Sequence, residues 1–123
     1  MRILVVEDER QVGELIQRAL ESLGNTCFLA RSAHDADLVL EQRQVDGVTL
    51  DLGMPDRGGL EWLEAVATSR PELARRTLVI TGQVLDGDAV VRVARCGAGV
   101  LIKPFTLEGL AAAIDSQLRP GAP

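Results

Sequence analysis

Short apolar runs alternate five times with segments whose apolar residues recur at helical spacing, and this alternation constrains the fold more than any other feature of the sequence. The runs cover residues 3–6, 26–30, 48–50, 77–80 and 99–102. Brief runs rich in β-branched and aliphatic residues are typical of strands buried on both faces of a sheet. Strands that alternate with helices pair in parallel through right-handed crossovers. The sequence therefore predicts an α/β domain with helices on both faces of one parallel sheet.

Residues that favour helix ends bound the segments between these runs. Gly24 ends the first helical pattern, Ser32 is suited to cap the second helix, and Thr106 is suited to cap the last. The third pattern ends before Pro71, because the residue that precedes a proline disfavours the helical conformation. Trp62 lies off the apolar stripe of this third helix, and we expect its side chain to be about half exposed.

The length of 123 residues fits a single domain, which we place at residues 1–119, with residues 120–123 as a tail or the start of a linker. No apolar run approaches the roughly 20 residues that a membrane-spanning helix needs. The chain reads as a strand almost from Met1, without the charged, apolar and small-residue regions of a signal peptide. We therefore expect a cytoplasmic protein that does not bind membranes.

The charge and the cysteines exclude several classes of function. A net charge of −5 argues against direct binding to nucleic acid, because contacts with phosphates require a basic face. Cys27 and Cys96 are far apart and fall in apolar segments, which indicates buried free thiols rather than a disulfide or a pair of metal ligands. His34 is the only histidine, so the sequence holds no zinc-binding pattern.

Polar residues follow four of the five apolar runs: Glu7-Asp8, Asp51, Thr81 and Lys103. Each has an ordinary structural explanation, since acidic residues open helices, aspartate favours turns, and lysine is usually a solvated charge. In open α/β sheets, however, ligands bind beyond the carboxyl ends of the strands. Four strand ends with polar residues on one edge indicate a functional site, with Asp51 as its leading candidate.

Electrostatics indicates what this site binds. Glu7, Asp8 and Asp51 carry three negative charges, and Lys103 restores only one positive charge. Carboxylates about 4 Å apart would repel by roughly 4 kcal/mol per pair at an effective dielectric near 20, so the site needs a divalent cation or protonated acids. A small set of oxygen ligands suits Mg²⁺ or Mn²⁺ that keeps several waters. Lys103 is the only lysine among 13 basic residues, and its compact ammonium suits a phosphoryl oxygen.

These motifs and their order resemble the receiver domains of two-component response regulators and hybrid histidine kinases. The resemblance rests on Glu7-Asp8, Asp51-Leu-Gly-Met-Pro55, Thr81-Gly82 and Lys103-Pro-Phe105, and it covers nearly the whole chain. It implies a flavodoxin-like, doubly wound fold of five βα units with strand order 2-1-3-4-5, as in chemotaxis regulators.

The resemblance also implies a role for each site residue. Asp51 would be the nucleophile that accepts a phosphoryl group from a phosphohistidine on a histidine kinase or a histidine phosphotransfer protein. Thr81 would hydrogen-bond the phosphoryl group and Lys103 would pair with it. Such a domain is a regulatory acceptor rather than an enzyme, and we expect a monomer or weak dimer. The implied Mg²⁺ ligands are Asp8, Asp51, the Gly53 carbonyl, and Glu7 directly or through water.

Two features depart from the family, and two other functions compete with the first. Val100 stands where many receivers carry an aromatic residue that moves on activation, and Gly53 and Gln83 occupy positions that tune the lifetime of the phosphate. The main alternative is a pseudo-receiver that binds proteins without being phosphorylated, which the complete acidic site disfavours. A flavodoxin-like or dehalogenase-like enzyme is disfavoured by the acidic turn at residues 7–9 and by Gly53.

Overall fold

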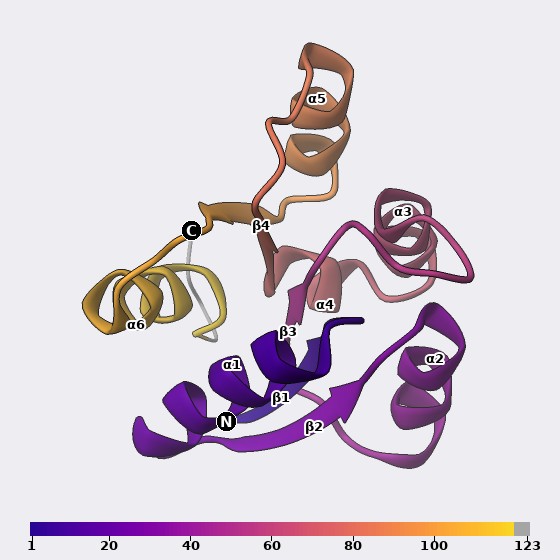
Figure 1. Cartoon of the computed structure of the whole chain (residues 1–123). Coiled ribbons are helices and arrows are strands. Elements are labelled where there is room, and N and C mark those ends of the chain that lie inside the picture. Colours follow the sequence, from indigo (N-terminus) through magenta and orange to yellow (C-terminus); the bar gives the residue numbers. More distant parts are fainter. Residues whose placement is uncertain (120–123) are drawn as a thin grey trace.

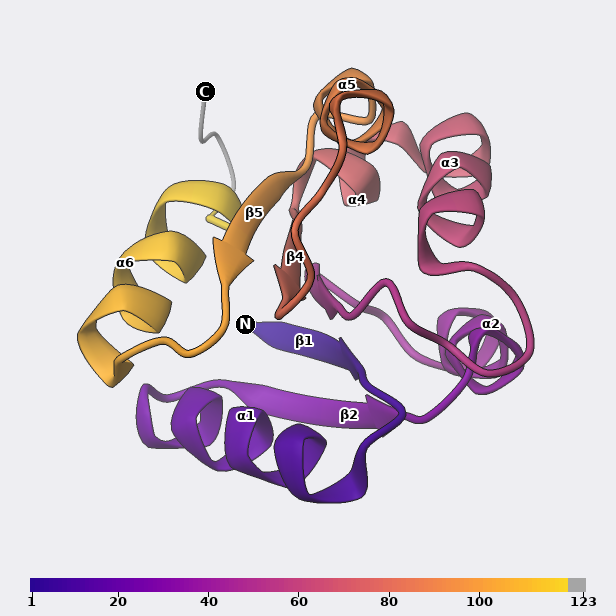
Figure 2. The same ribbon diagram turned by 45° about the horizontal axis from the view of Figure 1, so that its top comes forward.

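The computed structural model describes residues 1–119 and contains a parallel sheet with strand order β2-β1-β3-β4-β5. This order confirms the predicted flavodoxin-like topology (Figures 1 and 2). The predicted tail or linker at residues 120–123 lies outside the described residues. The strands are β1 (Arg2–Val6), β2 (Thr26–Ala30), β3 (Gly47–Leu50), β4 (Thr77–Thr81) and β5 (Gly99–Ile102).

Residues 1–119 form six helices, one more than the five-fold alternation predicts. The additional helix is short and begins at Pro71, directly after the break that the sequence indicates at Arg70. Proline fits the first position of a helix, since its missing N–H group would have no partner there. The same residue therefore ends one helix and starts the next. The helices are α1 (Arg10–Ser22), α2 (Ala33–Gln42), α3 (Gly59–Ser69), α4 (Pro71–Arg75), α5 (Gly87–Arg95) and α6 (Leu107–Gln117).

Two hydrophobic clusters fill the space between the sheet and its helices. On one face, α1 and α6 cover the sheet, with Ile16, Leu110 and Ile114 against the strand residues Val5 and Ile80. On the other face, α2, α3, α4 and α5 pack against the alternate strand residues. Figures 1 and 2 show α1 and α6 together on one side and α2 and α3 on the other. No helix of the described residues has the length and apolarity to cross a membrane.

The predicted helix ends are confirmed. The Ser32 hydroxyl accepts the Asp35 N–H at 3.1 Å at the start of α2, and the Thr106 hydroxyl accepts the Gly109 N–H at 2.9 Å at the start of α6. Gly24, just beyond α1, has φ +93°, a conformation that side chains disfavour. The cap of α5 by Asp86, which accepts the Ala89 N–H at 2.8 Å, was not anticipated.

The predicted exposure of Trp62 is wrong, since its side chain is only 1% exposed. Its ring joins the cluster under α2 and α3, and its Nε1 donates to Asp37 Oδ1 at 2.8 Å. An indole can be buried when its N–H finds such a partner, and the partner comes from a helix that the pattern of α3 does not reveal. Of the two cysteines, Cys96 is buried as predicted, whereas Cys27 is partly exposed; both thiols are free.

Thr49, on β3, has the one buried side-chain oxygen without a hydrogen-bond partner among the described residues. Because an unpaired buried hydroxyl costs free energy, we expect Thr49→Val to raise the free energy of unfolding by about 1 kcal/mol. The matched control is Thr77→Val, since the Thr77 hydroxyl is also buried but donates to the Leu73 carbonyl at 2.9 Å. This control should lower stability by about 1 kcal/mol. Urea denaturation measures both, and a less stable Thr49→Val protein would contradict the expectation.

Candidate functional site

The predicted site residues lie at one edge of the sheet, because the strands that deliver them are neighbours. Glu7 follows β1, Asp51 follows β3, Thr81 ends β4, and Lys103 follows β5. The backbone pairing continues to this edge: the Asp51 N–H donates to the Val6 carbonyl at 2.9 Å, and the Lys103 N–H to the Thr81 carbonyl at 2.9 Å. The sheet itself therefore positions the backbone of the four residues.

Three carboxylates gather at this edge. One oxygen of each of Glu7, Asp8 and Asp51 lies within 4.8 Å of the others. Glu7 is only 1% exposed, whereas Asp8 and Asp51 are partly exposed. Hard oxygen donors at this spacing, open to solvent on one side, fit a Mg²⁺ or Mn²⁺ ion that keeps waters for its remaining positions. The acidic cluster therefore has the chemistry of a divalent cation site.

Lys103 contacts this cluster through Glu7. Its Nζ donates to Glu7 Oε1 at 2.8 Å, and the Glu9 N–H donates to the other oxygen of Glu7 at 3.3 Å. An ammonium group carries three donors, so two remain for a further ligand. Burial raises the pKa of Glu7 to about 7, and Asp51 beside it adds to the rise, while Lys103 opposes it. The negative charge of the cluster can thus be reduced at Glu7 in two ways, by protonation of its carboxylate or by a cation bound to it.

The Thr81 hydroxyl has a defined orientation. It is buried and accepts the N–H of Gln83 at 3.1 Å. A hydroxyl that accepts one hydrogen bond keeps its own proton to donate. Thr81 can therefore donate to an oxygen of a bound group, the role that the family resemblance implies, while its own oxygen accepts from the loop that follows β4.

Gly53 lies beside Asp51, and its N–H donates to Asp51 Oδ1 at 3.4 Å. A side chain at this position would begin 3.9 Å from Asp51 Oδ2 and 4.0 Å from the Gln83 amide nitrogen. Glycine therefore places no side chain in the space beside the Asp51 carboxylate, which the Gln83 amide also borders. The role of the Gly53 carbonyl as a metal ligand stays a prediction.

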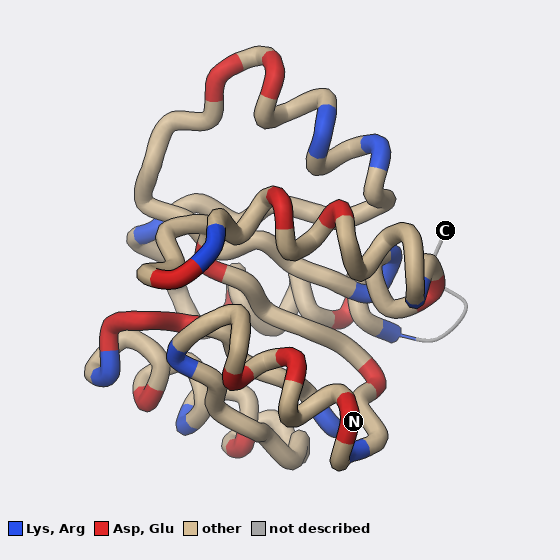
Figure 3. Tube along the Cα trace, turned by 90° about the vertical axis from the view of Figure 1, so that its right-hand side faces the viewer, with Lys and Arg blue, Asp and Glu red and all other residues tan. Residues whose placement is uncertain are grey.

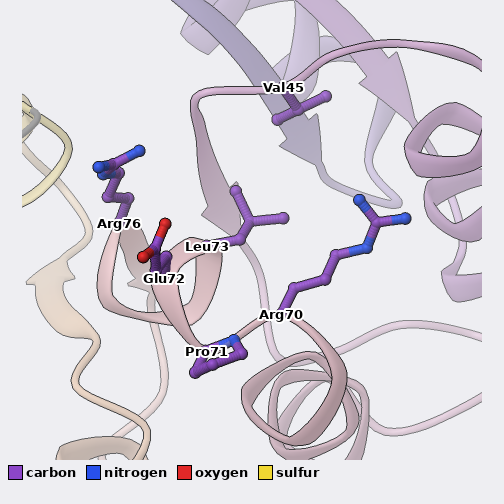
Figure 4. Close-up of a pocket in the computed structure, with 6 residues that line it drawn as sticks. All are labelled: Val45, Arg70, Pro71, Glu72, Leu73 and Arg76. Atoms are coloured by element: carbon purple, nitrogen blue, oxygen red, sulfur yellow. The ribbon is translucent and has the colours of Figure 1, made fainter.

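A pocket of about 360 Å³ lies elsewhere, next to the amino ends of β3 and β4 (Figure 4). Arg70 and Arg76 point to different sides of it, with Leu73 between them. It belongs to the opposite edge of the sheet from the acidic cluster. The residues that line this pocket are Val45, Arg70, Pro71, Glu72, Leu73 and Arg76.

Acidic and basic residues are interspersed along the face shown in Figure 3.

The family model for the response regulator receiver domain matches residues 3–115. The chain belongs to this family. Among curated proteins, the receiver is 36% identical over 127 residues to response regulator MprA of Mycolicibacterium vanbaalenii, covering 100% of this chain and 52% of that protein. It is 32% identical over 119 residues to transcriptional regulatory protein BasR of Escherichia coli, covering 97% and 53%. The chain thus spans about half the length of these relatives.

Solved structures agree with this assignment. A CheY-like receiver domain protein of Methanospirillum hungatei superposes with a TM-score of 0.86 at 25% identity, covering 95% of this chain and 92% of the other. The non-phosphorylated HemR receiver domain of Leptospira biflexa superposes with a TM-score of 0.85 at 27% identity, covering 99% and 97%. The receiver fold therefore extends over nearly the whole chain.

Sequence reasoning missed the residues that attach the loop after Asp51 to α2. Asp56 accepts the N–H groups of Ala33 and His34, and Arg57 pairs with Asp37. Asp56 follows Pro55, which marks a turn, but a turn signal does not reveal which distant helix an aspartate will cap.

The raised pKa of Glu7 predicts how the stability of the metal-free receiver depends on pH. Between its ordinary value of 4.5 and about 7, the folded protein holds a proton that the unfolded chain releases. Stability should therefore fall as pH rises from about 5 to 7, by roughly 2–3 kcal/mol. Urea denaturation in the presence of a chelator measures this slope. Glu7→Gln should flatten it, and an unchanged slope in that variant would contradict the assignment. Added Mg²⁺ should oppose the fall, because metal and proton compete for the carboxylate.

Proposed function

We propose that this receiver accepts a phosphoryl group on Asp51 from a phosphohistidine of a histidine kinase or histidine phosphotransfer protein. The observation that carries the proposal is the convergence of three carboxylates and one lysine at the carboxyl edge of the sheet. Phosphoryl transfer needs little covalent chemistry from a protein beyond a nucleophile, because positioning and charge stabilisation supply most of the catalysis. The family membership of the chain supports the same function.

The side chains divide this work. An oxygen of Asp51 forms a bond to phosphorus as the bond from phosphorus to the donor imidazole nitrogen breaks, and that nitrogen takes up a proton. Lys103 offers its two remaining donors to the phosphoryl oxygens, and Thr81 donates its hydroxyl proton. Both groups stabilise charge that gathers on the oxygens during transfer.

Mg²⁺, or Mn²⁺, would be held by Asp8, Asp51, the Gly53 carbonyl and Glu7, and when bound it neutralises negative charge on the acceptor and the phosphoryl group. The carboxylates that hold it are those that repel one another without it. Ion binding and phosphoryl acceptance are therefore proposed to be linked through the same residues.

The phosphorylated receiver is proposed to modulate an attached domain or a partner protein as a cytoplasmic signalling unit. It acts as a regulatory acceptor rather than an enzyme with turnover on a separate substrate, and as a monomer or weak dimer. The competing function, a pseudo-receiver that binds partners without phosphorylation, gives no reason to keep three carboxylates and a lysine together at one edge. Their repulsion costs free energy that a purely structural role does not require.

Intact-mass measurement with acetyl phosphate tests the proposal. The receiver should gain one phosphoryl group in the presence of Mg²⁺ and none in the presence of a chelator. Beryllofluoride, which mimics the bound phosphoryl group, should perturb amide resonances near residues 81–87 only with Mg²⁺. A receiver that binds Mg²⁺ yet gains no phosphoryl group from acetyl phosphate or any phosphohistidine donor would favour the pseudo-receiver.

Arginine should replace Lys103 poorly despite its equal charge. The planar guanidinium is wider than an ammonium and favours two parallel hydrogen bonds, whereas Lys103 approaches Glu7 as a point donor from the end of β5. We expect Lys103→Arg, like Lys103→Met, to lose most of the chemical-shift change that beryllofluoride should cause. A wild-type response in the arginine variant alone would show that charge suffices.

A further inference from the structure

We propose that Asp56 is a positioning residue for the acceptor loop, defined as residues 52–58, and that it acts by fixing this loop to the start of α2. The proposal rests on the function proposed above, since the loop carries the Gly53 carbonyl and follows Asp51. Among the described residues, Asp56 forms no side-chain hydrogen bond with the acidic cluster. Both of its carboxylate oxygens accept hydrogen bonds from α2.

The contact between Asp56 and α2 has two parts. Oδ1 accepts the Ala33 N–H at 3.0 Å, and Oδ2 accepts the His34 N–H at 3.0 Å. These are the first two amides of the helix, which have no partner within it, and the helix dipole favours a negative charge at this end. The two hydrogen bonds lower the pKa of Asp56, so the carboxylate is charged at neutral pH. One side chain thus holds the loop at two points.

The neighbouring residue adds a second attachment to the same helix. Arg57 Nη2 lies 2.8 Å from Asp37 Oδ2, and the other oxygen of Asp37 accepts the Trp62 indole N–H at 2.8 Å. Asp37 therefore joins the acceptor loop to the buried ring of α3. The exposed ion pair alone contributes little to stability, but its acidic member, Asp37, is held in place by the buried Trp62 indole. The loop and two helices form one connected set of contacts.

The base of the loop is closed independently. The Gly59 N–H, at the start of α3, donates to the Leu52 carbonyl at 3.0 Å. Between this closure and Asp56 lie Gly53, Met54 and Pro55. Glycine at position 53 gives the backbone freedom and no side chain to pack, so the position of its carbonyl depends on the anchors on either side. On the carboxyl-terminal side of Gly53, the contact of Asp56 with α2 provides this anchor.

Loss of this anchor should weaken ion binding more than it weakens the fold. Residues that orient metal ligands from outside typically contribute 10- to 100-fold to affinity. We expect Asp56→Ala to raise the Mg²⁺ concentration for half-maximal phosphorylation by acetyl phosphate by roughly 10-fold. The rate at saturating Mg²⁺ should change much less, because Asp51, Thr81 and Lys103 are intact. Asp56→Asn keeps one acceptor oxygen, so its Mg²⁺ concentration for half-maximal phosphorylation should lie between those of wild type and Asp56→Ala.

The matched control is Ser32→Ala. The Ser32 hydroxyl caps the same helix through the Asp35 N–H, so this variant also loses a cap of α2 but leaves the acceptor loop attached. Each variant loses one cap of the same helix, so both should lower stability to a similar, small extent. A role of Asp56 confined to helix stability therefore predicts equal effects of the two variants on Mg²⁺ dependence, whereas positioning predicts an effect of Asp56→Ala alone.

Amide hydrogen exchange provides a readout that does not depend on phosphorylation. Asp56→Ala should speed exchange at residues 53 and 54 relative to wild type and Ser32→Ala, in the metal-free protein. The proposal is overturned by wild-type Mg²⁺ dependence and exchange in Asp56→Ala, or by equal shifts in both variants. A wild-type receiver that takes up no phosphoryl group refutes the proposed function instead, and the exchange comparison together with direct Mg²⁺ titration then still decides the role of Asp56.

Discussion

Asp51→Asn should gain no phosphoryl group from acetyl phosphate or from a phosphohistidine donor, a complete loss rather than a reduced rate. The asparagine amide has nearly the shape of the carboxylate but lacks the anionic oxygen that attacks phosphorus. Glu7 should not substitute for it, because Glu7 is buried and paired with Lys103. Intact-mass measurement after incubation with Mg²⁺ and donor gives the stoichiometry directly.

The variant should fold at least as well as wild type, since removal of one charge relieves repulsion within the acidic cluster. Asp46→Asn is the matched control. Asp46 lies at the amino end of β3, opposite Asp51, and its carboxylate accepts the Arg2 N–H at 2.8 Å. It should be phosphorylated like wild type. Full uptake of a phosphoryl group by Asp51→Asn would assign the acceptor to another residue.

The sequence was sufficient to predict that these residues meet at one edge of the sheet, because they are tied to strand ends. In a doubly wound sheet the carboxyl ends of all strands lie at the same edge. The residues that follow β1, β3, β4 and β5 therefore lie close together regardless of how the helices pack. Glu7, Asp51, Thr81 and Lys103 lie at that edge as predicted. The strand order itself came from the family resemblance and not from the pattern of apolar residues.

The contacts between elements were not predictable in the same way. The burial of Trp62 and its hydrogen bond to Asp37 depend on how α2 packs beside α3, which neither helix encodes alone. The attachment of Asp56 to α2 joins residues 22 and 23 positions apart. The local pattern identified Ser32 as a cap of α2 because that interaction spans three residues. It had no means to identify a second cap from a distant loop.

The sequence left the charge balance of the site open, and the structure adds that only one of the three carboxylates is buried. Glu7 is 1% exposed, so burial disfavours its charged form, whereas the Lys103 ammonium favours it. Asp8 and Asp51 face solvent and remain available as ligands. The buried member of the cluster should therefore set the pH dependence of the site, while all three carboxylates remain candidate ligands of the proposed ion.

Gly59→Ala should disrupt both stability and phosphoryl acceptance, although alanine normally favours a helix. A Cβ at this first residue of α3 would lie 2.5 Å from the Leu52 Cα and 2.9 Å from the Asp51 carbonyl oxygen. Both neighbours are backbone atoms, so relief requires movement of the chain that carries Asp51. We expect a loss of about 3 kcal/mol in the free energy of unfolding, near the upper end for overpacking. Phosphorylation should slow strongly, because small displacements of a reacting group are costly.

Gly87→Ala is the matched control, since Gly87 is likewise the first residue of a helix, α5, but has no atom within 4 Å of the added Cβ. Alanine there should leave stability unchanged or raise it by up to about 1 kcal/mol. The contrast separates steric conflict from helix propensity, because propensity predicts the same sign at both positions. Urea denaturation and phosphorylation rates measure the pair. If Gly59→Ala were as stable and as readily phosphorylated as Gly87→Ala, the close approach of α3 to the Asp51–Leu52 backbone would not constrain the acceptor.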